Sequence, residues 1–175
     1  MITLLDVLEE RGWKVVRREQ GSIDLGTVVS QRYPHLPEDY VEFLSAFDDC
    51  WSENHQMWFL SAADFRGESD KAFKWDEWER MSLDAAEGDA DLTQQVKSFW
   101  DQHIPILHSV GSGQYEYLAL RLSGEDAGAI VHGFEPEFEE ADIVCPSFGN
   151  VGALAAAVRD LEARVEPRPT KPPSR

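Results

Sequence analysis

The chain has 175 residues, enough for one domain to bury a core without disulfides or a structural metal. Its 33 acidic and 16 basic residues give a formal net charge of −17, a field that repels phosphate backbones and anionic lipids. The charge therefore argues against binding of nucleic acid or a membrane. It favours a basic protein partner, although acidity can also serve solubility alone.

The compartment is inferred from cysteine usage and the N-terminus. Two cysteines, Cys50 and Cys145, are too few for a disulfide-dependent secreted fold. Residues 1–10 carry no basic stretch and are interrupted by Asp6, which predicts an amphipathic helix rather than a signal peptide. No segment reaches the roughly 20 apolar residues that span a bilayer. We therefore expect a cytoplasmic protein with reduced thiols.

The first third of the chain predicts helices around a short strand. Residues 2–11 have a helical apolar face, residues 13–16 are β-prone, and a connector around Pro34 follows. A second helix is expected over 37–47. Pro37 suits its first turn, acidic residues follow where the helix dipole favours them, and an apolar stripe recurs at spacings of three and four.

The middle of the chain is mixed. Residues 57–60 form a short apolar run that predicts a strand, and Ser61 can cap a helical turn. Trp75, Trp78 and Met81 have helical spacing. Residues 92–100 carry a strong helical stripe that ends before Pro105.

The second half changes to strands separated by short glycine-containing turns, at 104–110, 115–122, 128–134 and 141–145. A closing helix begins at Ser147 or Asn150. We predict an α+β fold: an antiparallel meander of about four to six strands, packed with N-terminal, central and C-terminal helices. Residues 1–165 are expected to form one domain, and the proline-rich segment 166–175 a disordered tail.

Four landmarks occur in this order: Leu36-Pro37-Glu38-Asp39-Tyr40 with Phe43-Leu44, Ile104-Pro105-Ile106 before Gly111-Ser112-Gly113, Gly128-Ala129-Ile130-Val131, and Ser147-Phe148. Together they resemble the SUKH superfamily, which includes the yeast cell-wall-synthesis regulator and many bacterial immunity proteins. The resemblance covers roughly residues 30–160. Asp48-Asp49-Cys50 stands where the family often has Asn-Gly, and the Trp-rich segment 73–81 has no counterpart.

The resemblance implies a non-enzymatic binding domain without metal or cofactor. It points to an immunity protein that blocks a toxic effector, which is basic when it must hold nucleic acid. We expect a monomer or a weak dimer. A regulatory or scaffold protein of the same fold, without a toxin partner, is the main alternative.

Carboxylates interleaved with large aromatic side chains are the candidate partner-binding residues, because aromatics supply buried anchors and carboxylates pair with Arg or Lys. They lie in three segments: Asp48, Asp49, Trp51 and Glu53; Trp75, Asp76, Glu77 and Trp78; and Glu135, Glu137 and Glu139. The competing interpretation is that the aromatics form core and the carboxylates the solvated side of the same segments.

Catalysis is a third hypothesis. Cys50 lies close to His55, and three histidines, His103, His108 and His132, fall in or beside predicted strands and can meet on one face. No metal-ligand spacing or nucleophile-elbow pattern accompanies them. We therefore interpret Cys50 as a buried thiol beside an acidic loop.

Overall fold

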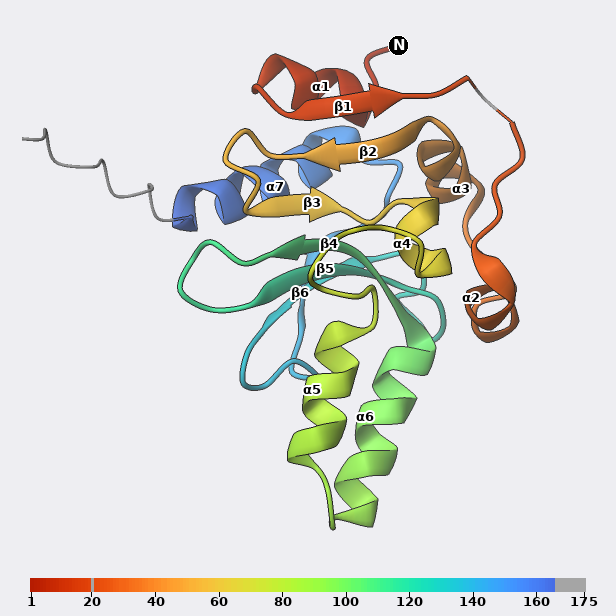
Figure 1. Cartoon of the computed structure of the whole chain (residues 1–175), viewed down its shortest axis with the longest axis vertical. Coiled ribbons are helices and arrows are strands. Elements are labelled where there is room, and N and C mark those ends of the chain that lie inside the picture. Colours follow the sequence, from red (N-terminus) through yellow and green to blue (C-terminus); the bar gives the residue numbers. More distant parts are fainter. Residues whose placement is uncertain (20, 166–175) are drawn as a thin grey trace, which may run out of the picture.

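Seven antiparallel strands form one sheet in the computed structural model of the chain, which describes residues 1–19 and 21–165 (Figure 1). The strands follow each other across the sheet in sequence order, so the sheet is a meander. They are β1 Lys14–Arg17, β2 Phe47–Trp51, β3 Met57–Phe59, β4 His103–Ser109, β5 Glu116–Arg121, β6 Ile130–Phe134 and β7 Asp142–Cys145. The predicted α+β class and antiparallel topology are confirmed.

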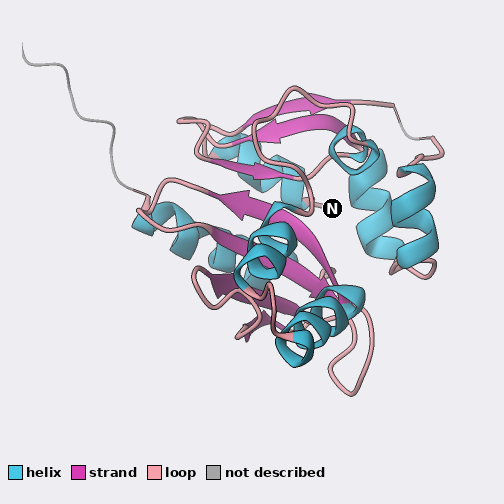
Figure 2. Cartoon of the chain, turned by 60° about the horizontal axis from the view of Figure 1, so that its bottom comes forward, coloured by secondary structure: helices cyan, strands magenta, loops and turns pink. Residues whose placement is uncertain are grey.

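Seven helices surround the sheet within the described residues. They are α1 Leu4–Glu10, α2 Gly26–Arg32, α3 Glu38–Ser45, α4 Ala62–Arg66, α5 Glu77–Ala85, α6 Ala90–Gln102 and α7 Val151–Arg164. Helix α7 lies behind the sheet and contacts both α1 and β7. Helices α5 and α6 lie side by side and extend away from the sheet as a hairpin (Figures 1 and 2).

The sheet buries both of its faces, and strand β5 shows this most clearly. Successive side chains of a strand point to opposite faces. Leu118 and Leu120 join the larger hydrophobic cluster with α1, α3 and α7, whereas Tyr117 and Ala119 join a smaller cluster with α5 and α6. The two clusters hold the central helical hairpin and the terminal helices on opposite sides of one sheet.

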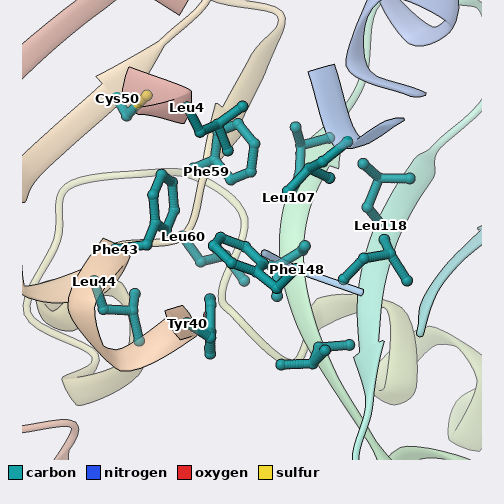
Figure 3. Packing of buried hydrophobic residues seen from close by; sticks show 14 of the residues in the cluster. Leu4, Tyr40, Phe43, Leu44, Cys50, Phe59, Leu60, Leu107, Leu118 and Phe148 are labelled. Carbon is teal, nitrogen blue, oxygen red and sulfur yellow. The ribbon is translucent and has the colours of Figure 1, made fainter. Parts of the chain in front are cut away.

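The landmarks that carry the family resemblance meet in the larger cluster (Figure 3). The Tyr40 ring on α3 lies 5.2 Å from the Phe148 ring, and the Phe43 ring lies 5.0 Å from Phe148 and 5.1 Å from Phe59 on β3. Two motifs about a hundred residues apart in sequence are thus in contact, so their order along the chain reflects packing in one core.

The number of strands exceeds the predicted range because of β2. We predicted that the second helix continues to Phe47 and that Asp48 and Asp49 form an acidic loop. The structure ends α3 at Ser45 and pairs β2 with β1 in register Val15 to Cys50. Burial of Phe47 and Cys50 accounts for the strand, whereas two adjacent aspartates, poor strand formers, concealed it in the sequence.

Helix α2 was also missed, within the predicted connector. Its β-branched residues Thr27, Val28 and Val29 are weak helix formers, and its N-cap residue Leu25 makes no side-chain capping bond. Burial of Val29 and contact with α4 stabilise it instead. The predicted tail, 166–175, lies outside the described residues. In the part of the chain that the structure describes, no helix is long and apolar enough to cross a membrane.

Two candidate protein-binding grooves

The candidate residues of the first segment border a hollow that we name the β2 groove. Its volume is about 480 Å³, and it lies between β2 and the loop after α4. Its lining residues are Asp48, Asp49, Trp51, Ser61, Ala63, Glu68, Ser69, Asp70, Lys71 and Ala72. The structure therefore brings Asp48, Asp49 and Trp51 together, as strand neighbours rather than as a loop.

The charge of the β2 groove is largely compensated from within the chain. The Lys71 ammonium lies 3.2 Å from the Asp49 carboxylate and 5.0 Å from the centre of the Trp51 ring. It also lies 2.7 Å from Asp64, whose carboxylate closes the capping box of α4 with Ser61. Asp48 lies 3.9 Å from the Arg18 guanidinium. These carboxylates already have cations beside them.

Glu53 does not join this groove. It follows β2 in the turn to β3 and borders a separate hollow of about 390 Å³ with Arg11, Trp13 and Glu162. The turn is well defined, because the Ser52 side chain accepts the Met57 amide proton at 3.0 Å.

The acidic segment after β6 borders a second hollow, which we name the α5–α6 groove. It has a volume of about 450 Å³ and lies between α5, α6 and the β6–β7 loop. Its lining residues are Ser82, Ala85, Leu92, Gln95, Val96, Phe99, Pro136, Glu137, Glu139 and Glu140. Leu92, Val96 and Phe99 supply the apolar lining, and the loop supplies three glutamates.

The β6–β7 loop is fixed to the core beneath it. Phe138 is buried, with its ring stacked on Trp78 at 5.5 Å, and its carbonyl accepts the Tyr117 hydroxyl proton. The Trp100 indole donates to the Glu139 carboxylate at 2.9 Å. Gly133 makes this arrangement possible, since any side chain there would overlap the Tyr117 ring. The glutamates thus extend from a loop that Phe138 and Glu139 anchor to the core.

The two tryptophans of the Trp-rich segment pack within the chain. Trp78 is 1% exposed and belongs to the smaller cluster, so its ring is not available to a partner. Trp75, expected within the helix, precedes α5 and packs 5.9 Å from Phe65 and 6.3 Å from Tyr33. Burial therefore excludes Trp78 as an interface anchor, whereas Trp75 is only partly buried and its place in a partner surface stays a prediction.

The carboxylates of the Trp-rich segment and the first glutamate after β6 also have partners within the chain. Asp76 pairs with Arg80 at 3.0 Å, and Glu77 accepts the Lys74 amide proton at 2.9 Å. Glu135 accepts the Tyr115 amide proton at 2.9 Å. These three side chains fix the start of α5 and the end of a hairpin.

The thiol singled out for catalysis lies in the core. Cys50 is 0% exposed, and burial raises its pKa to about 12, so the nucleophilic thiolate is not populated near neutral pH. His55 lies in the β2–β3 turn with its ring 5.3 Å from Trp51, while Cys50 belongs to the core cluster.

The three histidines do not form a cluster. His108 pairs with Tyr117 and His132 with Leu118, so they lie on opposite faces of the sheet. His103 stacks on Phe99 at 4.0 Å, and His132 lies 3.0 Å from the Glu116 carboxylate. The described residues contain no group of three or more metal-ligating side chains that could hold a metal ion.

Apart from Glu137 and Glu139, the lining residues of the α5–α6 groove were not predicted as binding candidates. The sequence predicts Leu92 and Phe99 within the helical apolar stripe of residues 92–100 and places Glu140 in the same acidic loop as Glu137 and Glu139. Leu92, Val96 and Trp100 recur every four residues, so the sequence does not distinguish them, whereas in the structure Val96 and Trp100 are buried and Leu92 is 42% exposed.

Comparison with known proteins places the chain in a family. Residues 31–151 match the SMI1 / KNR4 family (SUKH-1). The chain belongs to the SMI1 / KNR4 family (SUKH-1). No curated protein and no solved structure matches the chain.

The SUKH-1 match contains most of the sheet and both grooves. It runs from the end of α2 to the first residue of α7, so α1 and β1 precede it and nearly all of α7 follows it. The SUKH resemblance seen in the sequence landmarks is therefore confirmed.

Proposed function

We propose that this SUKH-1 member is a non-enzymatic protein-binding domain of the bacterial immunity type. It neutralises a cognate toxin by tight association that occludes the toxin's working surface. The toxin is expected to be basic and to act on nucleic acid, since such proteins need cationic surfaces to hold phosphate. The main support is the net charge of −17 on a member of this family.

Charge supports the proposal through both encounter and complementarity. A strongly acidic protein attracts a basic partner over distances near the Debye length, which raises the association rate. Carboxylates at the contact can then occupy positions that phosphates take in the toxin's substrate. The glutamates of the α5–α6 groove suit this role because the loop that carries them is already ordered.

The enzyme hypothesis has less support. Its two candidate centres were Cys50, which is buried with a raised pKa, and three histidines that lie apart. The regulatory alternative predicts the same fold and differs only in the partner. Only an experiment that identifies the partner can therefore distinguish it from the immunity role.

The test is co-expression in a bacterial host with each toxic domain encoded near the gene for this chain. We expect growth to be restored against one of these domains and not against unrelated toxins. An unrelated acidic protein of similar net charge is the control, and its failure to rescue shows that charge alone is insufficient. No rescue from any neighbouring domain would contradict the immunity role and favour the regulatory alternative.

A further inference from the structure

The α5–α6 groove combines an apolar lining with partly open access. Leu92, in the first turn of α6, is 42% exposed, and Phe99 is half-buried two turns later on the same helix. Val96 between them is buried. A partly exposed leucine beside an aromatic ring gains free energy when a partner's apolar side chain covers it.

The border of this groove is acidic and uncompensated. Among the described residues that line it there is no Lys or Arg, and no ion pair in the described part of the chain involves Glu137 or Glu140. Residues 76–102 have a net charge of −6 and residues 135–140 a net charge of −4. More than half of the chain's net charge of −17 thus belongs to the elements that build the groove.

The groove is also preorganised. Glu139 is held by the Trp100 indole, and Phe138 anchors the loop between Trp78 and the Tyr117 hydroxyl. A partner therefore does not have to order this loop on binding, which lowers the entropic cost of association.

We propose that the α5–α6 groove receives a basic segment of the partner protein, with one apolar side chain on Leu92 and Phe99 and flanking Arg or Lys side chains on Glu137 and Glu140. This inference rests on the proposed function and names the surface and the chemistry of the contact. A second copy of the chain is disfavoured as occupant, because it would bring another net charge of −17 to an acidic border.

The β2 groove is the less suitable acidic surface. Asp49 already pairs with Lys71, and Glu68 lies 2.8 Å from the Arg66 guanidinium. A partner's cation would have to displace these internal cations. At the α5–α6 groove it meets carboxylates that are free to form new ion pairs.

The first test uses two synthetic peptides and backbone amide NMR shifts of the full chain. One peptide is Lys-Lys-Leu-Lys-Lys-Phe-Lys-Lys, and its control replaces Leu and Phe by Ser at equal charge. We expect the apolar peptide to shift amides in α6 and the β6–β7 loop more strongly than its control, and Leu92→Gln to abolish the difference. Gln at this first-turn position is compatible with the helix start. Equal shifts from both peptides, spread over the acidic surface, would overturn the proposal.

The second test measures affinity for the toxin domain that co-expression identifies. We expect Leu92→Gln and the double variant Glu137→Lys/Glu140→Lys each to weaken binding by about tenfold or more. The matched control, Glu10→Lys/Glu125→Lys, changes net charge equally at two exposed positions away from the groove and is expected to stay within about threefold.

The outcomes separate the two proposals. If the unaltered chain rescues growth but the groove variants bind as tightly as it does, the proposed function stands and the groove assignment is wrong. If the unaltered chain rescues against no neighbouring domain, the proposed function fails, and the peptide experiment still decides whether the groove selects basic apolar segments.

Discussion

His108 is an ionisable side chain buried in the core without a hydrogen-bond partner among the described residues. It is 0% exposed, with its ring 4.8 Å from Trp78 and 5.6 Å from Trp58, and neither ring nitrogen has a hydrogen-bond partner in the described structure. Burial lowers its pKa to about 3; to a smaller extent the Asp64 carboxylate raises this pKa and the Lys71 ammonium lowers it. The folded protein therefore holds His108 neutral.

This burial predicts an acid-sensitive stability. In the unfolded chain the imidazole titrates near 6.5, so between that pH and about 3 the unfolded state binds one more proton than the folded state. The part of the free energy of unfolding that depends on neutral His108 is therefore fully present above pH 6.5. As the pH falls below 6.5, the free energy of unfolding decreases by about 1.4 kcal/mol per pH unit.

Urea unfolding at a series of pH values tests the His108 contribution. We expect His108→Leu to remove this part of the slope between about pH 4 and 6, with His35→Gln, at an exposed histidine, as the control. A His108→Leu variant that keeps the original slope would show that the imidazole is not buried in its neutral form.

Cys50 gives a second prediction at the residue scale. Because burial raises its pKa to about 12, the thiol should resist alkylation by iodoacetamide in the folded protein and react only after unfolding. Cys50→Ala should retain rescue in the co-expression experiment. Rapid alkylation of the native protein, together with loss of rescue by Cys50→Ala, would revive the catalytic hypothesis.

At the scale of elements, the ion pairs of Lys71 stabilise the loop between α4 and α5. Its side chain is 7% exposed, its ammonium bridges Asp64 and Asp49, and the same ammonium lies over the Trp51 ring. Removing one partner of a buried ion pair leaves the other charge without compensation, which costs several kcal/mol.

We therefore expect Lys71→Met to lower the free energy of unfolding by about 3 kcal/mol. The matched control is Lys74→Met, three residues later and exposed, which should change stability by about 0.5 kcal/mol or less. Chemical denaturation of both variants measures the two changes in the free energy of unfolding. Equal effects of the two substitutions would mean that the ion pair does not hold the loop.

Elements with strong local signals were predictable from the sequence. The capping residue Ser61 and the stripe of α6 rest on interactions within a few residues, and the structure has both. Strand β2 and helix α2 were not predictable, because the Asp48-Asp49 pair disfavours a strand and the β-branched run Thr27–Val29 disfavours a helix. Tertiary burial of Phe47 and Val29 overrides those local preferences.

At the scale of the whole molecule, fold class and family could be predicted because the hairpins and the ordered landmarks are local sequence patterns. The α5–α6 groove could not be predicted in this way. It forms where residues 82–99 meet residues 136–140, and only folding brings these segments together. The sequence identified the acidic loop but not the leucine and phenylalanine that it faces.

The charge of the whole molecule also decides how binding should depend on salt. Long-range attraction between an acidic protein and a basic partner is screened as ionic strength rises, whereas burial of an apolar anchor is not. We therefore expect high salt to weaken the complex strongly but not completely.

The most direct measurement is calorimetric titration of the purified chain with the toxin domain that it protects against, at about 50 mM and about 500 mM salt. We expect a tight complex at low salt whose Kd rises about tenfold or more at high salt, mainly through slower association. A complex with the same Kd at both salt concentrations, or no complex with any toxin domain encoded near the gene, would contradict the claim that this chain neutralises a basic toxin through its acidic surface.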